Sequence, residues 1–142
     1  MISLVIAGSR TVTPTFEAIT EAVRGSFAPD PARDLPKAYI REVVCGCADG
    51  ADNTGAEWAR ANDIPVWPEP ITPEDWKLGK YLGPRMRNRR MAIRGDAAVI
   101  FWDGISGGSA DMACRMAARG KPCIVIPTSK RTSKNARNNP RR

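Results

Sequence analysis

Five short apolar runs, each rich in β-branched residues, constrain the fold of this chain more than any other feature. They are Ile2–Ala7, Tyr39–Cys45, Ile64–Trp67, Ala97–Trp102 and Cys123–Ile126. Most of them are separated by stretches whose apolar residues recur at helical spacing. Parallel strands need crossover connections, and alternating strands and helices are typical of a parallel sheet covered on both faces. We therefore predict an α/β fold.

Four of the intervening stretches predict helices. Thr13 and Pro14 are suited to the cap and first residue of the first helix, which continues to Phe27. The other three helices are expected over Asn53–Asn62, Pro84–Arg94 and Gly108–Arg119. We expect loops at Ala28–Lys37 and Pro68–Leu82. Together these elements predict one Rossmann-like domain over residues 1–127, with about five parallel strands and helices on both faces.

The composition excludes several kinds of site. The 142 residues include no histidine, which excludes Ser-His-Asp triads and histidine metal sites. The four cysteines have neither zinc-ribbon nor redox-pair spacing, so we expect no metal and no cofactor. Since the chain has no apolar run of about 18 residues and no basic leader, we predict a cytoplasmic protein without membrane contact.

The positive charge is concentrated at the end of the chain. Residues 128–142 hold six of the 22 basic side chains and none of the 15 acidic ones, so the net charge of +7 falls to +1 without them. This segment has no apolar periodicity, and we predict a disordered basic tail. It is either a solubilising terminus or a non-specific contact for nucleic acid.

Glycine-rich loops follow three of the predicted strands. We expect strand order 3-2-1-4-5, with a ligand at the carboxyl ends of the first and fourth strands. Backbone amides at the start of a helix attract anions, so a phosphate is the simplest guest. The loops are Gly8–Arg10, Gly46–Asp52 and Asp103–Ser109.

Charged and aromatic residues near these loops are candidate ligand contacts. If a helix begins at Pro84, Arg85 and Arg87 lie in its unfavourable first turn. A phosphate bound by Arg87 and Asn88 would compensate their charge, and the alternatives are a carboxylate of Glu74 or Asp75 or simply water. Either Asp49 or Asp52 is suited to capping a helix, and Asp52 is also suited to binding a ribose or base or to acting as a general base. Trp76 and Tyr81 are candidates for stacking on a base.

Four segments in order along residues 2–126 resemble the YpsA-related branch of the SLOG superfamily. They are VIAGSR from Val5, GCADGAD from Gly46, DWKLGKYLGPRMRN from Asp75 and FWDGISGGSADM from Phe101. The superfamily joins DNA-processing proteins with cytokinin-activating LOG phosphoribohydrolases. The resemblance implies a nucleotide pocket formed by Gly8, Ser9, Arg10, Gly50, Asp52, Arg87, Asn88, Gly107, Gly108 and Ser109.

One departure from the family pattern bears on the activity. LOG hydrolases carry PGGxGTxxE, and the same alignment places Cys114 where their catalytic glutamate stands, so we leave open whether this chain is an enzyme. Asp52, Asp103 and Asp111 remain as carboxylates that could serve cleavage in another geometry. The resemblance implies a ligand sensor of phage or bacterial conflict and, because LOG relatives are dimers, a homodimer.

Three functions follow from these observations. The first is binding of a nucleotide or a nucleotide-derived ligand, for sensing or sequestration. The alternative is LOG-like cleavage of the N-glycosidic bond of a nucleoside monophosphate, with Asp52 as the candidate catalytic residue. The second alternative is a nucleic-acid-binding module that uses the basic tail and the Arg85–Arg94 face.

Overall fold

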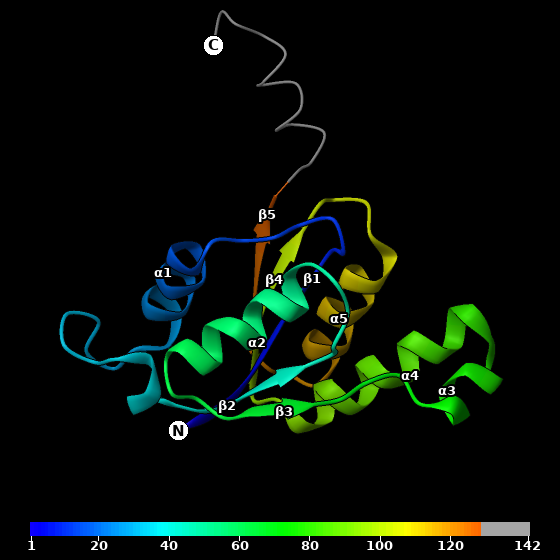
Figure 1. Ribbon diagram of the computed structural model, residues 1–142, viewed down its shortest axis with the longest axis horizontal. Coiled ribbons are helices and arrows are strands. Elements are labelled where there is room, and N and C mark those ends of the chain that lie inside the picture. The colour runs from blue at the N-terminus through cyan, green and yellow to red at the C-terminus, as the bar shows by residue number, and fades with distance from the viewer. Residues whose placement is uncertain (129–142) are drawn as a thin grey trace, which may run out of the picture.

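The computed structural model describes residues 1–128 and contains a five-stranded sheet in which every pairing is parallel (Figure 1). The strands are β1 (Ile2–Gly8), β2 (Ile40–Cys45), β3 (Val66–Pro68), β4 (Ala97–Trp102) and β5 (Cys123–Pro127). Their order is β3-β2-β1-β4-β5. The α/β class and the strand order are therefore confirmed. The predicted basic tail, apart from Thr128, lies outside the described residues.

Helices cover both faces of the sheet. They are α1 (Phe16–Phe27), α2 (Ala51–Ala61), α3 (Pro73–Lys77), α4 (Gly79–Arg94) and α5 (Gly107–Ala118), with a short 3-10 turn η1 (Pro36–Ala38) before β2. Alternate side chains of β1 point to opposite faces. Leu4 and Ile6 pack in the cluster with Trp58 of α2, whereas Val5 packs with Met91 of α4. α1 and α2 thus lie on one face, and α4 and α5 on the other.

All four predicted helix starts differ from the observed ones, α2 beginning at Ala51 rather than Asn53 and α5 at Gly107 rather than Gly108. α1 begins at Phe16 because Thr15 provides the cap, its Oγ1 accepting from the Ala18 amide at 3.0 Å. α4 begins at Gly79, so Pro84 lies inside the helix rather than at its start. Proline removes one amide donor from a helix, and near the amino end that loss affects only the first turns. Arg85 and Arg87 consequently lie beyond the first turn of α4.

The segment predicted as the loop Pro68–Leu82 contains an additional helix. Thr72 and Asp75 form a capping box, in which each side chain accepts from the other residue's amide, at 3.1 Å and 2.8 Å. Pro73 occupies the first position, where a missing amide costs nothing. The sequence signal Thr-Pro-Glu-Asp was present but was not recognised. α3 packs on α4 and forms a helical hairpin with it, at the right of Figure 1.

Within residues 1–128, no helix is long and apolar enough to cross a membrane.

Candidate ligand-binding site

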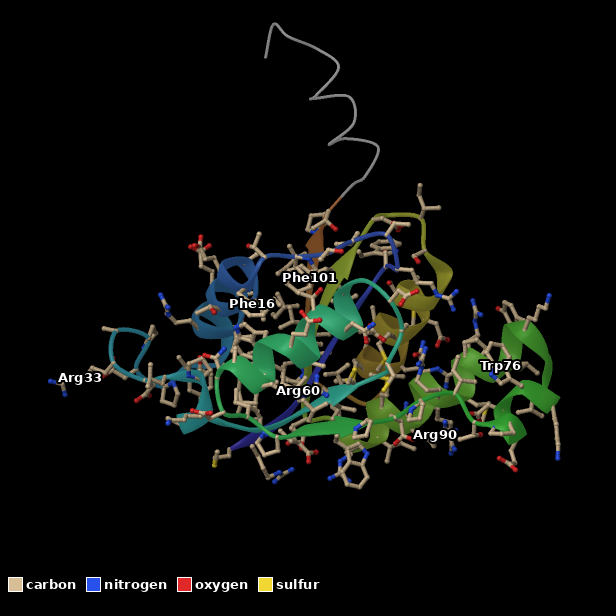
Figure 2. All side chains as sticks on the ribbon, viewed as in Figure 1. Phe16, Arg33, Arg60, Trp76, Arg90 and Phe101 are labelled. Carbon is tan, nitrogen blue, oxygen red and sulfur yellow. The ribbon has the colours of Figure 1, made fainter. Side chains whose placement is uncertain are left out.

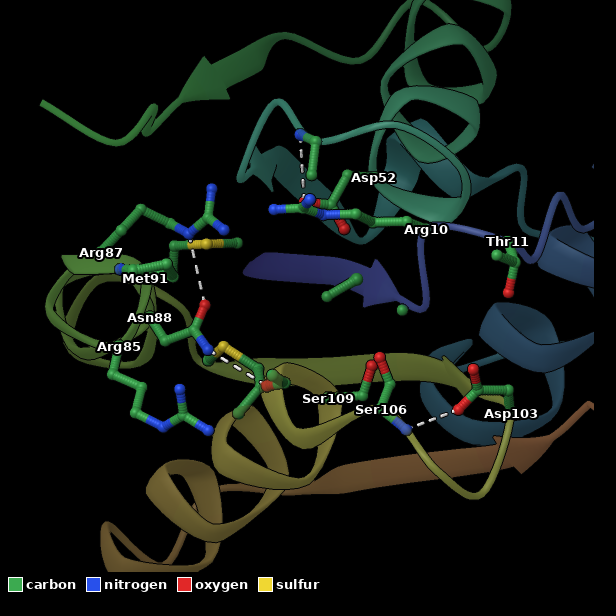
Figure 3. A pocket seen from close by; sticks show the side chains of 16 residues that line it. Arg10, Thr11, Asp52, Arg85, Arg87, Asn88, Met91, Asp103, Ser106 and Ser109 are labelled. Atoms are coloured by element: carbon green, nitrogen blue, oxygen red, sulfur yellow. Dashed lines mark hydrogen bonds between the residues drawn. The ribbon is translucent and has the colours of Figure 1, made fainter. Parts of the chain in front are cut away.

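A cavity of about 320 Å³ opens at the carboxyl ends of β1 and β4, where the strand order reverses. Figure 3 shows α4 on one side of it, the start of α5 below, and the loop leading into α2 on the opposite side. Of the predicted residues, Gly8, Arg10, Asp52, Arg87, Asn88, Gly108 and Ser109 line the cavity. Three loops far apart in sequence therefore meet at the predicted point.

The start of α5 forms one wall of the cavity. Ser106 is the cap residue, but its side chain makes no capping hydrogen bond. The amides of Gly107, Gly108 and Ser109 find no acceptor among the hydrogen bonds of the described residues. These donors, together with the positive end of the helix dipole, attract an anion.

Arg85 adds positive charge at this same helix end. Its Nη2 lies 3.2 Å from the position that a Cβ on Gly107 would occupy. Its Nη1 donates to the Tyr81 carbonyl at 3.0 Å, and its guanidinium stacks on the Tyr81 ring at 3.7 Å from the centroid. A cation held against the positive end of a helix is unfavourable until an anion lies between them.

Arg87 projects from α4 into the opposite side of the cavity and is only 7% exposed. It donates to the carbonyl of Gly46 and, through Nε, to Asn88 Oδ1 at 3.3 Å. Burial lowers the pKa of Arg87. A guanidinium keeps its charge in proteins. Within residues 1–128 Arg87 makes no ion pair.

Asn88 links α4 to the start of α5. Its Nδ2 donates to the Gly108 carbonyl and to Asp111 Oδ2, both at 3.1 Å. Asp111 in turn accepts from Arg115 Nε at 2.9 Å. The carboxylate of Asp111 is therefore already bonded within α5, and Asn88 fixes the free amides of α5 beside Arg87.

Asp52 is the buried carboxyl of the cavity, with 5% of its surface exposed. Burial raises its pKa to about 6, against the opposing effects of the nearby Arg87 charge and of hydrogen bonds from the Ala48 and Gly8 amides. Asp52 lies in the first turn of α2, and Gly50 takes the cap position. The capping interpretation of Asp52 was therefore wrong, and the carboxyl stays available to a ligand near neutral pH.

The Gly8 and Ser9 amides of the turn after β1 already have acceptors, whereas the Arg10 and Thr11 amides have none among the hydrogen bonds of residues 1–128. The Gly8 amide bonds to Asp52, and the Ser9 amide donates to the Phe101 carbonyl at 3.0 Å. Ser9 is buried, and its Oγ accepts from the Asp103 amide at 3.1 Å. Ser9 thus ties the β1 and β4 loops together, which is a structural role.

Two of the predicted glycines serve backbone packing. A Cβ on Gly8 would lie 2.3 Å from the Phe101 carbonyl oxygen. Gly50 has φ +79, and a Cβ there would lie 2.5 Å from the Arg10 carbonyl oxygen and 2.6 Å from that of Ser9. Only glycine fits both demands at Gly50. These positions shape the loops without contacting a ligand through side chains.

The aromatic candidates lie outside the cavity lining. Trp76 is 48% exposed on α3, and Figure 2 shows it on the α3–α4 hairpin, toward the edge of the molecule. Tyr81 is 67% exposed and stacks with Arg85. Asp75, proposed as an alternative partner for Arg85 and Arg87, instead pairs with Arg90 at 2.6 Å, which lowers the pKa of Asp75.

Several lining residues were absent from the sequence-based set. They are Ala7, Thr11, Ala48, Pro84, Met91, Ser106 and Met112; Arg85 and Asp103 were discussed from the sequence but not assigned to the pocket. Asp103 accepts from the Ile105 and Ser106 amides at 2.8 Å and 2.7 Å, and these bonds lower its pKa. Met91 and Met112 come from buried faces of α4 and α5. Cys114, at the position of the LOG glutamate, is exposed and outside the lining.

No family model, curated protein or solved structure matches this chain. The resemblance to the YpsA-related branch of the SLOG superfamily therefore stays a prediction. Function has to be argued from the geometry of the site.

Proposed function

We propose that this protein binds a nucleotide or a nucleotide-derived ligand in the cavity between β1 and β4. One observation carries the proposal. The unbonded amides at the start of α5 face the same cavity as the guanidinium groups of Arg85 and Arg87. This combination of a helix amino end with arginine donors suits a phosphate group.

The phosphate would lie against Gly107, Gly108 and Ser109. There it would separate the Arg85 cation from the positive end of α5 and so remove an unfavourable contact. Arg87 would approach the phosphate from the side of Asn88 that faces away from α5. The Asn88 carboxamide accepts from Arg87 and donates to the Gly108 carbonyl of α5. The amides of α5 are preorganised by that link, which reduces the ordering cost of binding.

The remainder of the cavity suits a nucleoside. Met91 and Met112 give it an apolar wall, and Thr11, Asp52 and Ser109 offer hydrogen-bonding groups for sugar hydroxyls or base edges. Its volume of about 320 Å³ is at the small end of the ligand-site range of about 300–1,000 Å³. A single nucleotide, rather than a larger cofactor, is the expected guest of this cavity.

Calorimetric titration with AMP, GMP, CMP, UMP and inorganic phosphate tests the proposal. Arg85→Gln is compared with Arg89→Gln, because Arg89 is an exposed arginine of the same helix that lies outside the cavity lining. We expect a saturable signal for at least one nucleotide and about a tenfold loss in Arg85→Gln, which corresponds to about 1.4 kcal/mol. Equal affinities in the two variants, or no binding, would overturn the proposal.

A second candidate function is hydrolysis of the N-glycosidic bond of the same ligand. The observation that favours it is the buried Asp52 carboxyl, whose pKa of about 6 suits proton transfer near neutrality. Chromatography of released base distinguishes the two functions. Release that disappears in Asp52→Asn, with nucleotide affinity retained, would establish the hydrolase, whereas intact nucleotide after long incubation would leave binding alone.

A further inference from the structure

A second cavity, of about 340 Å³, adjoins the first. It lies between the loop that follows β2 and the loop that precedes α3. Arg10, Ala48 and Arg87 line both cavities, so these residues form the junction between them. The remaining lining residues are Gly46, Cys47, Asp49, Pro70 and Ile71.

The junction carries two guanidinium groups without ion pairs among residues 1–128. The Arg87 guanidinium bonds only to the neutral oxygens of Gly46 and Asn88 within that part of the chain. Arg10 repels Arg87, which contributes to the lowered pKa of Arg87. Asp52 faces both arginines but is itself destabilised as an anion by burial. A dianionic group at the junction would therefore be stabilised by both guanidinium groups.

The two phosphate-attracting centres are neighbours. Arg87 Nε lies 3.3 Å from Asn88 Oδ1, and Asn88 Nδ2 lies 3.1 Å from the Gly108 carbonyl at the start of α5. One carboxamide thus separates the junction from the free amides of α5. Adjacent phosphates of a diphosphate can occupy two such neighbouring centres, whereas a monophosphate can occupy only one.

The second cavity is suited to a further organic group. Pro70 and Ile71 provide apolar contact, and the exposed carboxylate of Asp49 can accept hydrogen bonds from hydroxyls. A ligand that ended at its phosphate would leave this compartment empty. The second cavity lies beyond Arg10 and Arg87 as seen from the first. A group bound there would therefore lie on the side of the diphosphate opposite the nucleoside.

We propose that the ligand class is a nucleoside diphosphate with a second group, such as a sugar, on its terminal phosphate. The nucleoside lies in the first cavity, the diphosphate runs from the start of α5 to Arg10 and Arg87, and the second group lies between Asp49 and Ile71. This inference rests on the proposed nucleotide site. It concerns the terminal phosphate and the second group, which the first cavity does not hold.

Titrations with two ligand series test the inference. The probes are AMP, ADP and ADP-ribose, and GMP, GDP and GDP-mannose. Ile71→Trp fills the second cavity only, and Ile93→Trp is the matched control on an exposed face of α4. Asp49→Trp, at an exposed position of the same cavity, serves if Ile71→Trp fails to fold.

In at least one series we expect the diphosphate sugar to bind the wild type more tightly than the monophosphate by about tenfold or more. Ile71→Trp should remove that advantage and leave the affinity for the monophosphate unchanged. Ile93→Trp should keep the advantage. Equal affinities for the monophosphate and the diphosphate sugar, insensitive to Ile71→Trp, would overturn the inference and leave the proposed function standing. Absence of binding by every probe would overturn both.

Discussion

Asp52→Asn should change the pH dependence of folding by an amount that follows from the burial of this carboxyl. Its pKa of about 6 in the folded protein lies about two units above the value of about 3.9 for an unfolded aspartate. At 1.36 kcal/mol per unit, ionised Asp52 costs the folded state about 3 kcal/mol. The folded state binds more protons than the unfolded state between these values, so this contribution weakens folding as pH rises from about 4 to 6.

The assay is urea unfolding of wild type and Asp52→Asn, followed by tryptophan fluorescence at several pH values. Subtracting the two curves cancels groups that both proteins share. The free energy of unfolding of the variant relative to wild type should rise by about 2 kcal/mol between about pH 4 and pH 7.5, because most of the titration falls there. Asp49→Asn removes an exposed carboxylate from the same loop and is the matched control.

A difference that stays constant with pH would refute the reasoning, since it would mean that Asp52 titrates alike in both states. A difference that falls with rising pH would refute it more strongly. In that case the charges of Arg87 and Arg10 would outweigh the burial of the carboxyl.

Two further predictions concern residues that shape the site. Gly46→Ala places a Cβ 2.6 Å from Asp52 Oδ2 and 2.8 Å from Arg87 Nη1, so urea unfolding should show a loss of about 1–3 kcal/mol. Gly25→Ala in α1, where the new Cβ would meet nothing within 4 Å beyond its chain neighbours and its own helix backbone, should instead gain about 0.5–1 kcal/mol, and equal effects would contradict the packing argument. Asp75→Ala removes the Arg90 ion pair and the capping box of α3, and should cost about 1.5–3 kcal/mol at neutral pH. The low pKa of Asp75 means that this loss should shrink as pH falls below about 4, and a loss that is unchanged there would show that the pair adds nothing.

The sheet could be predicted from the sequence because its central strands β1, β2 and β4 are largely buried on both faces and read as continuous apolar runs. Val99 and Ile100 of β4, for example, face opposite layers, and both are fully buried. The strand order then placed the glycine-rich loops at one edge of the sheet, and Gly8, Asp52 and Gly108 of these loops do line the cavity. These expectations needed only local patterns and the geometry of parallel strands.

Details that depend on individual hydrogen bonds could not be predicted in this way. The Gly8 and Ser9 amides were expected to be free in the turn after β1, but Asp52 and Phe101 accept from them. Arg85 was expected in the first turn of its own helix, but its guanidinium lies at the amino end of α5. Such contacts between distant segments leave no periodic signal in the sequence.

The central claim is that nucleotide phosphate binds at the start of α5 between Arg85 and Arg87. An NMR titration of the nitrogen-15-labelled protein with the tightest-binding nucleotide tests it most directly. We predict saturable shifts of the Gly107, Gly108 and Ser109 amides and of the Arg87 Nε–H, with the amides of α1 unmoved. Saturable binding that leaves these four signals in place would contradict the claim.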